Sequence, residues 1–163
     1  MAEAETRTPM FVDGFERELD EGLRFAMPKD WRGLEIKDFI LTTDSSKTFI
    51  SVSPPSVLDK QMAKIEADGT LDDTARGNCM EALASSCKRV RLDNSGRMAL
   101  PTALCTEVGI TQDATIALRG AGMRGFRIYS KARFEEHEQA RHSAFTPQRM
   151  PMTTEAAKKL MGL

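Results

Sequence analysis

The sequence predicts an α+β protein in which two copies of one small β-hairpin module share a core. Three observations support this prediction: an internal repeat, short strand-like segments that alternate with helical ones, and turn residues at matching places. The repeat aligns residues 19–28 with residues 92–101, a shift of 73 residues. Leu, Asp, Arg, Ala and Pro fall at the same offsets in both copies, which indicates duplication of one structural unit.

Each copy then continues through the same order of elements. A proline begins a short helix at 28–34 and at 101–108, because proline at the first helical position loses no needed N–H. Gly109 is a suitable end for the second of these helices. The remaining elements are two strands and a longer helix that starts after a serine. The strand-like segments lie at 39–42 and 48–52 in the first copy and at 115–118 and 126–129 in the second.

One unit therefore reads hairpin, short helix, hairpin, longer helix, and we expect both units to form one small β-barrel core with flanking helices. The first repeat spans 10–71, a connecting helix spans 72–86, and the second repeat spans 87–142. Acidic residues at the start of the connecting helix suit the positive end of its dipole. Residues 143–163 are expected to form a flexible tail with a weak helix at 154–161.

The composition is ordinary for a globular protein, with 40% hydrophobic and 29% charged residues in 163. No apolar run is long enough to cross a bilayer, and the first nine residues lack the features of a secretory signal. We therefore expect a cytoplasmic protein with no membrane partner. The formal net charge is −1, so any surface that binds nucleic acid must be a local patch.

The second copy has the sharper hairpin pattern. Residues 88–92 and 97–100 alternate apolar side chains with basic or small ones, the period of half-buried strands. The turn between them consists of Asp93, Asn94, Ser95 and Gly96. Aspartate accepts hydrogen bonds from backbone N–H groups within such turns, and glycine takes the positive φ that they require. The outer faces of the strands should carry the basic residues Lys88, Arg89, Arg91 and Arg97.

These cations form a modestly positive patch. The planar guanidinium of arginine can hold a phosphate or the edge of guanine with two hydrogen bonds, and a two-stranded ribbon fits the major groove of DNA. The patch thus predicts contact with double-stranded DNA. The spacing alone also fits a plainer interpretation, in which a solvated strand face makes surface ion pairs.

At this motif the sequence resembles the MraZ family, relatives of the AbrB-type swapped-hairpin transcription factors. The family carries D-x-x-G-R within an apolar frame that ends in proline, once in each of two tandem halves, and residues 93–101 fit that frame throughout. The resemblance covers about residues 11–138. It implies two AbrB-like repeats in a nucleoid-associated regulator, usually a repressor. Such a regulator would bind promoter direct repeats of division and cell-wall genes as a ring-shaped homo-oligomer.

The first copy departs from the family pattern. Its turn runs Asp20-Glu21-Gly22-Leu23-Arg24, with glycine one place early and Leu23 where glycine is expected. Asp20 and Gly22 are still assigned as turn-forming residues. The resemblance implies that Arg97 is the principal DNA contact, and Arg24 is its counterpart in the weaker copy.

Two other functions remain open. One is an AbrB-like antitoxin or partner-binding module whose C-terminal segment, 154–163, binds a protein. The other is a homologue that keeps the oligomeric scaffold but has lost DNA binding, which the altered first turn and the net charge would explain.

No catalytic, cofactor or metal site is expected. Residues 120–125 spell G-x-G-x-x-G, but a strand-like segment follows where a dinucleotide site needs a helix, so a hairpin turn is predicted. Nucleophile-elbow and phosphate-loop motifs are missing, so no enzyme is predicted. His137 and His142 are five residues apart and would lie on different helix faces. Three cysteines without C-x-x-C spacing are expected to be reduced thiols: Cys79, Cys87 and Cys105.

Overall fold

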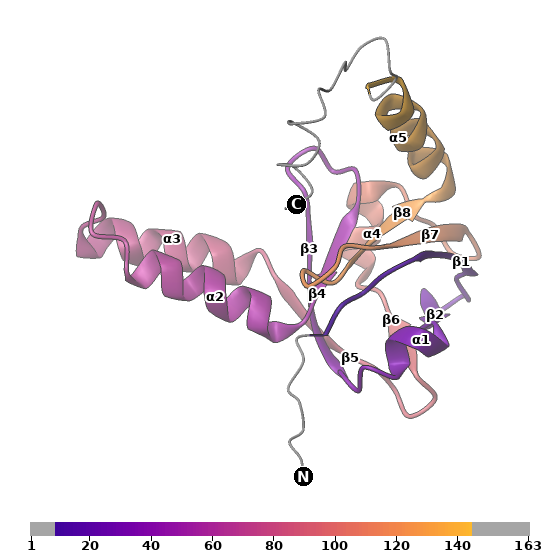
Figure 1. Cartoon of the computed structure of the whole chain (residues 1–163), viewed down its shortest axis with the longest axis horizontal. Helices are drawn as coiled ribbons and strands as arrows, with labels where there is room; N and C mark the ends of the chain where they lie inside the picture. Colours follow the sequence, from indigo (N-terminus) through magenta and orange to yellow (C-terminus); the bar gives the residue numbers. More distant parts are fainter. Residues whose placement is uncertain (1–8, 145–163) are drawn as a thin grey trace, which may run out of the picture. The chain divides into compact units, whose positions relative to one another are not determined.

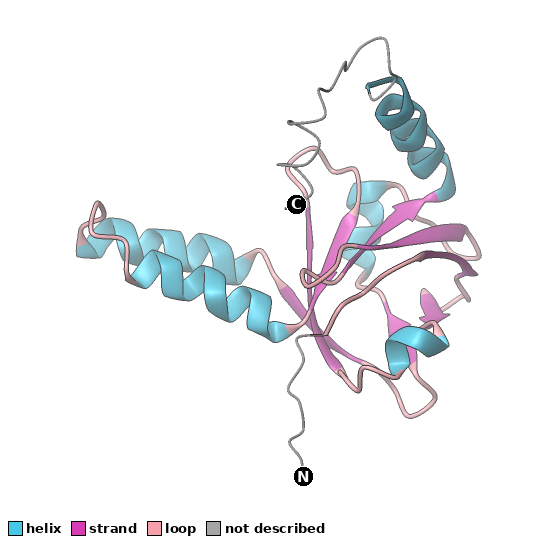
Figure 2. Cartoon of the chain, in the orientation of Figure 1, coloured by secondary structure: helices cyan, strands magenta, loops and turns pink. Residues whose placement is uncertain are grey.

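The fold is known from a computed structural model, which describes residues 9–144. It belongs to the α+β class, as the sequence predicted (Figure 2). The strands are β1 (Gly14–Glu18), β2 (Arg24–Ala26), β3 (Asp38–Thr43), β4 (Ile50–Ser53), β5 (Lys88–Arg91), β6 (Arg97–Ala99), β7 (Thr115–Gly120) and β8 (Phe126–Ser130). The helices are α1 (Lys29–Arg32), α2 (Pro55–Glu66), α3 (Asp73–Ser85), α4 (Thr102–Val108) and α5 (Lys131–Ala144). The helix expected at 154–161 and most of the expected tail lie outside the described residues.

Six strands form one antiparallel sheet in the order β1-β7-β8-β4-β3-β5, and β2 pairs only with β6 in a separate two-stranded sheet. The large sheet has β1 and β5 as its edges. The prediction of a closed barrel is therefore wrong. The large sheet stays open because β2 and β6 are only three residues long and pair with each other instead of joining the two edges.

The strands on either side of the second turn do not pair with each other, so the expected hairpin over residues 88–100 is also wrong. β5 pairs with β3, whereas β6 pairs with β2. The tight turn itself is present, because the N–H of Asp93 donates to the carbonyl of Arg97 at 3.0 Å. The later hairpins, β3–β4 and β7–β8, form as predicted.

Strand pairing is reciprocal between the N-terminal half, β1 to α2, and the C-terminal half, β5 to β8. β1 pairs with β7 while β5 pairs with β3, and the two halves also meet at β4–β8 and β2–β6. Strands β1 to β4 correspond in order to strands β5 to β8. When each strand is replaced by its counterpart, the order of the large sheet reads the same in reverse. Each half thus supplies hydrogen-bonding partners that the other half lacks.

One hydrophobic core serves both halves. Phe25 of β2 and Met98 of β6 are buried in it, together with apolar side chains of the large sheet. Trp31 of α1 packs against Phe126 with ring centroids 4.6 Å apart and edge-on against Phe11 at 5.5 Å. The core therefore fixes the two-stranded sheet and the short helices beside it, since removing a buried aromatic ring of this kind costs about 3–5 kcal/mol.

The helices begin and end close to the predicted residues. Gly109 ends α4 in the left-handed conformation, with φ of 75°. α2 and α3 lie side by side and extend away from the sheet (Figure 1), and neither contains a fully buried residue. α3 corresponds to the expected connecting helix, and Asp72 caps it by accepting a hydrogen bond from the N–H of Ala75 at 2.7 Å.

A boundary between two structural units falls after Lys131, and α5 belongs almost wholly to the second unit. Within residues 9–144, no helix combines the length and the apolar character needed to cross a membrane. The glycine-rich segment at 120–125 is the turn of the β7–β8 hairpin, as predicted, and the strand β8 follows it.

Candidate nucleic-acid interface

The two Asp turns have the same hydrogen-bonding geometry. In the second turn, Asp93 Oδ1 accepts from the N–H groups of Ser95 and Arg97, both at 2.9 Å. In the first turn, Asp20 Oδ1 accepts from the N–H groups of Gly22 and Arg24, again both at 2.9 Å. The aspartates are therefore the residues that hold both turns closed.

The left-handed position of each turn explains why the sequence pattern differed between them. Gly96 has φ of 78°, and Leu23 occupies the matching place with φ of 58°. Each donates its N–H to the carbonyl of the turn aspartate at 3.0 Å. Leucine thus takes a conformation that glycine adopts without steric cost, and the altered first motif still forms the same turn.

The hydrogen bonds also keep both turn carboxylates charged. The backbone N–H of Arg97 is the largest influence that lowers the pKa of Asp93, and the N–H of Ser95 and the Arg97 guanidinium add to it. The pKa of Asp20 is lowered in the same way by Arg24 and Gly22. Each carboxylate therefore remains an anion beside an arginine.

Each turn arginine is anchored by one nitrogen. Arg97 Nε lies 3.1 Å from Asp93 Oδ2, and Arg24 Nε lies 3.0 Å from Asp20 Oδ2. The arginine side chains are 39% and 42% exposed. Their terminal nitrogens have no hydrogen-bond partner within residues 9–144. The carboxylate thus orients the guanidinium and leaves its outer edge open to solvent.

The β2–β6 ribbon, residues 24–26 and 97–99, brings these two arginines together. Its register pairs Arg24 with Ala99 and Ala26 with Arg97. Paired residues of an antiparallel ladder share a face, so both arginines lie on the outer face, with small alanines between them. As diagonal neighbours their backbones are about 7–8 Å apart. The opposite face is buried in the core.

The other predicted contacts lie on β5, the edge strand of the large sheet, and not on the ribbon. Arg91 is exposed and forms an ion pair with Asp38 across the ladder, at 2.8 Å. Lys88 and Arg89 are exposed as well. Within residues 9–144, Arg89 makes no ion pair. The structure therefore separates the predicted cations into a ribbon pair and a strand group.

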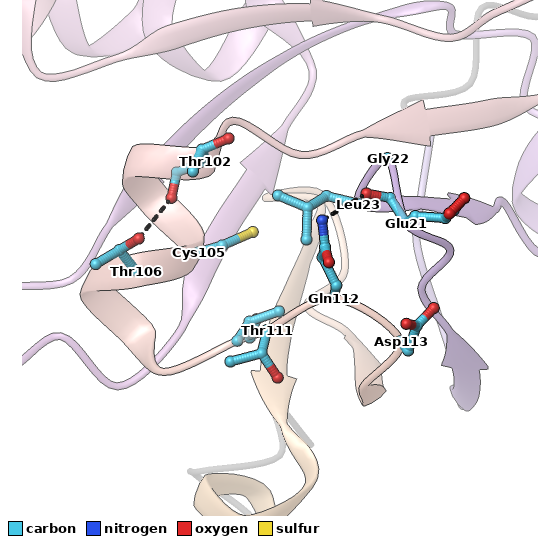
Figure 3. A pocket seen from close by; sticks show the side chains of 10 residues that line it. Glu21, Gly22, Leu23, Thr102, Cys105, Thr106, Thr111, Gln112 and Asp113 are labelled. Atoms are coloured by element: carbon cyan, nitrogen blue, oxygen red, sulfur yellow. Dashed lines mark hydrogen bonds between the residues drawn. The ribbon is translucent and has the colours of Figure 1, made fainter.

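A helix from the opposite half lies beside each turn. The first turn and α4 enclose a pocket in which the side chain of Gln112 donates to the carbonyl of Glu21 at 3.0 Å (Figure 3). Two acidic residues and no basic residue line this pocket, the acids being Glu21 and Asp113. Cys105 of α4 is buried there, and burial raises the pKa of its thiol to about 11.

The second turn has a more basic neighbourhood. A pocket between this turn and the segment that begins with α1 is lined by Arg32, Lys37, Glu35 and Asp93, among other residues. Sequence reasoning missed Arg32 and Lys37, because they belong to the N-terminal half and only the pairing of strands between the halves brings them to the second turn. Among the described residues, no three potential metal-ligating side chains come together.

No protein-family model matches the chain. The chain is similar to the Transcriptional regulator MraZ of Caulobacter vibrioides (strain NA1000 / CB15N), with 27% identity over 135 residues, or 78% of this chain and 81% of that protein. It is also similar to the Transcriptional regulator MraZ of Phenylobacterium zucineum (strain HLK1), with 28% identity over 138 residues, or 80% and 81% of the two chains. These similarities confirm the resemblance to the MraZ family that the D-x-x-G-R motif indicated.

Proposed function

We propose that the chain is a DNA-binding transcriptional regulator that contacts double-stranded DNA through the outer face of the β2–β6 ribbon. The observation that carries the proposal is the pair of outward-facing arginines, Arg24 and Arg97, each oriented by a turn aspartate. The name of the related MraZ proteins, transcriptional regulator, supports the same function. The proposed role is binding, with no catalytic step.

The ion pairs within the turns are compatible with DNA contact. An exposed ion pair contributes little to stability, so a phosphate can approach without a large loss. Because only Nε is engaged, the terminal nitrogens of Arg97 can donate two parallel hydrogen bonds to a phosphate or to guanine. Asp93 then acts as a positioning residue that fixes the direction of the guanidinium.

We further propose that the two halves are tandem AbrB-like repeats, over residues 10–71 and 87–142, joined by the helix at 72–86. The reciprocal strand pairing supports a duplication, because each strand has a counterpart that makes the equivalent pairing. The exchange of strands between halves also resembles the swapped hairpins of AbrB-type factors. The segment from 143 onward is proposed as a tail outside both repeats.

The family resemblance suggests the biological setting. We propose a nucleoid-associated repressor of a division and cell-wall operon that binds promoter direct repeats as a ring-shaped homo-oligomer. The ribbon supports a multivalent design, because the charges of its two arginines are balanced by the two turn aspartates that pair with them, so one ribbon alone is a weak site. Several linked ribbons on repeated DNA sites would raise the apparent affinity.

The test is a titration of fluorescent promoter DNA, measured by anisotropy at two salt concentrations. Arg97→Ala should weaken binding by about 1–3 kcal/mol, and Arg24→Ala should weaken it less, because acidic side chains surround the first turn. Arg124→Ala, which removes an exposed arginine from the β7–β8 loop, is the matched control. Equal small effects of Arg97→Ala and Arg24→Ala would contradict the proposal.

A scaffold protein without DNA binding is the second candidate. It is favoured by one observation: Arg24, Arg91 and Arg97 each have a carboxylate partner at 3.1 Å or less. Genuine phosphate binding releases counterions, so affinity should fall steeply with salt. Wild-type protein that shows no salt-dependent binding to promoter or unrelated DNA would support the scaffold and exclude the regulator.

A further inference from the structure

Arg32 of α1 lies directly over the second turn, although it belongs to the other half of the chain. A Cβ atom placed on Gly96 would be 2.7 Å from Arg32 Cδ and 3.1 Å from Arg32 Nη1. A side chain at position 96 would force the Arg32 side chain out of this position. Gly96 therefore serves two purposes, since its φ of 78° also closes the turn.

The charge of Arg32 is not neutralised in the way that the charge of Arg97 is. Arg97 pairs with Asp93, whereas Arg32 is exposed and forms no ion pair with any residue from 9 to 144. Two acids line the pocket beside Arg32. Asp93 is already engaged by Arg97, and Glu35 lies beyond ion-pair distance of Arg32. Lys37, in the same pocket, adds a further positive charge.

Among residues 9–144, those that line the pocket beside the first turn include no equivalent cation. The shift of 73 residues that relates the turns places Cys105 of α4 at the position of Arg32, and Cys105 is buried and lines the pocket beside the first turn. That pocket carries Glu21 and Asp113 in place of basic residues. The two turns thus share their backbone geometry but differ in the charge supplied by the opposite half.

We propose that Arg32 is a DNA-phosphate contact, so that the second turn is a composite site made of Arg97 from one half and Arg32 from the other. This inference rests on the proposed function. Arg97 has its direction fixed by Asp93 and suits a defined acceptor. Arg32 has no such carboxylate and suits the backbone of a polyanion, so its contribution is sequence-independent.

The test compares wild-type protein with Arg32→Gln, Arg32→Lys and Arg124→Gln on promoter DNA and on an unrelated duplex, at salt concentrations from 50 to 200 mM. Loss of one phosphate contact lowers the salt slope by about 0.9. When salt rises from 50 to 200 mM, the fold-loss of affinity should therefore be about 3.5 times smaller for Arg32→Gln than for wild type, on both duplexes. Arg32→Lys should keep the slope, because the charge remains, and Arg124→Gln should match wild type.

The possible failures are distinguishable. If wild type binds with a steep salt dependence and Arg32→Gln behaves as Arg124→Gln does, the inference is wrong and the proposed function stands. If wild type does not bind either duplex, the proposed function fails and the inference fails with it. Urea unfolding of each variant checks the fold, and a change of slope counts only when the unfolding midpoint is that of wild type.

Discussion

The strained first turn allows a test in which the usual effect of glycine on stability is reversed. Leu23 has φ of 58° and also packs against the core from a half-buried position. A direct Leu23→Gly substitution would mix relief of strain with loss of these contacts. Comparing Leu23→Gly with Leu23→Ala separates them, because both variants lose the leucine side chain and only alanine keeps the steric conflict.

The expected difference in stability between Leu23→Gly and Leu23→Ala follows from two opposing free-energy contributions. A residue with a Cβ atom in the left-handed region costs about 1–2 kcal/mol relative to glycine. Glycine in turn loses more conformational freedom on folding than alanine, a penalty of about 0.4–1 kcal/mol. The difference leaves Leu23→Gly more stable than Leu23→Ala by about 0.5–1 kcal/mol. At a position with negative φ the order would be the opposite.

Urea unfolding followed by the fluorescence of Trp31, the single tryptophan of the chain, provides the assay. Trp31 is buried in the core, so its emission should report loss of tertiary packing. With a slope of about 2 kcal/mol per molar urea, the midpoint of Leu23→Gly should lie about 0.3–0.5 M above that of Leu23→Ala. An equal or lower midpoint for the glycine variant would refute the claim that position 23 is strained.

Two further predictions concern pH and close packing. The pKa of Asp93 and of Asp20 is lowered from 3.8 in the folded protein, so their stabilising effect is complete above 3.8 and is lost as the pH falls below it. Asp93→Asn should therefore weaken the acid dependence of the thermal unfolding midpoint, and an unchanged acid profile would contradict this. Gly125→Ala should destabilise more than Gly122→Ala in urea unfolding, because a Cβ on Gly125 would lie 2.0 Å from the carbonyl oxygen of Val52, while one on Gly122 meets nothing within 4 Å. Equal losses of stability in the two variants would contradict this and show that backbone strain alone determines the effect of both substitutions.

The sequence predicted those parts of the fold that depend on neighbouring residues. Strand-like segments on either side of a glycine-rich turn located β7 and β8, and Gly109 marked the end of α4. Alternation of apolar and polar side chains over residues 97–100 placed the Arg97 side chain on the outer face of its strand, next to the buried Met98. Periodicity shows which face of a strand is buried, and it carries no information on which strand lies beside it.

The errors follow from this limit. The pairing of β2 with β6 depends on contacts between residues about 73 positions apart, so a local pattern indicated a hairpin instead. The presence of Leu23 in place of glycine suggested a damaged turn, but tertiary packing holds Leu23 at positive φ and the turn is intact. Arg32 gave no signal at all, because its position over Gly96 exists only after the halves have exchanged strands.

The exchange of strands has a consequence for assembly. In a protein with a single copy of this module, two separate molecules would have to meet to complete the ladders, and their stability would depend on concentration. Here the α2–α3 hairpin tethers the partners, so their encounter is intramolecular and independent of dilution. Because the two halves are different stretches of one chain, their turns can have different neighbours, such as Cys105 beside the first turn and Arg32 beside the second.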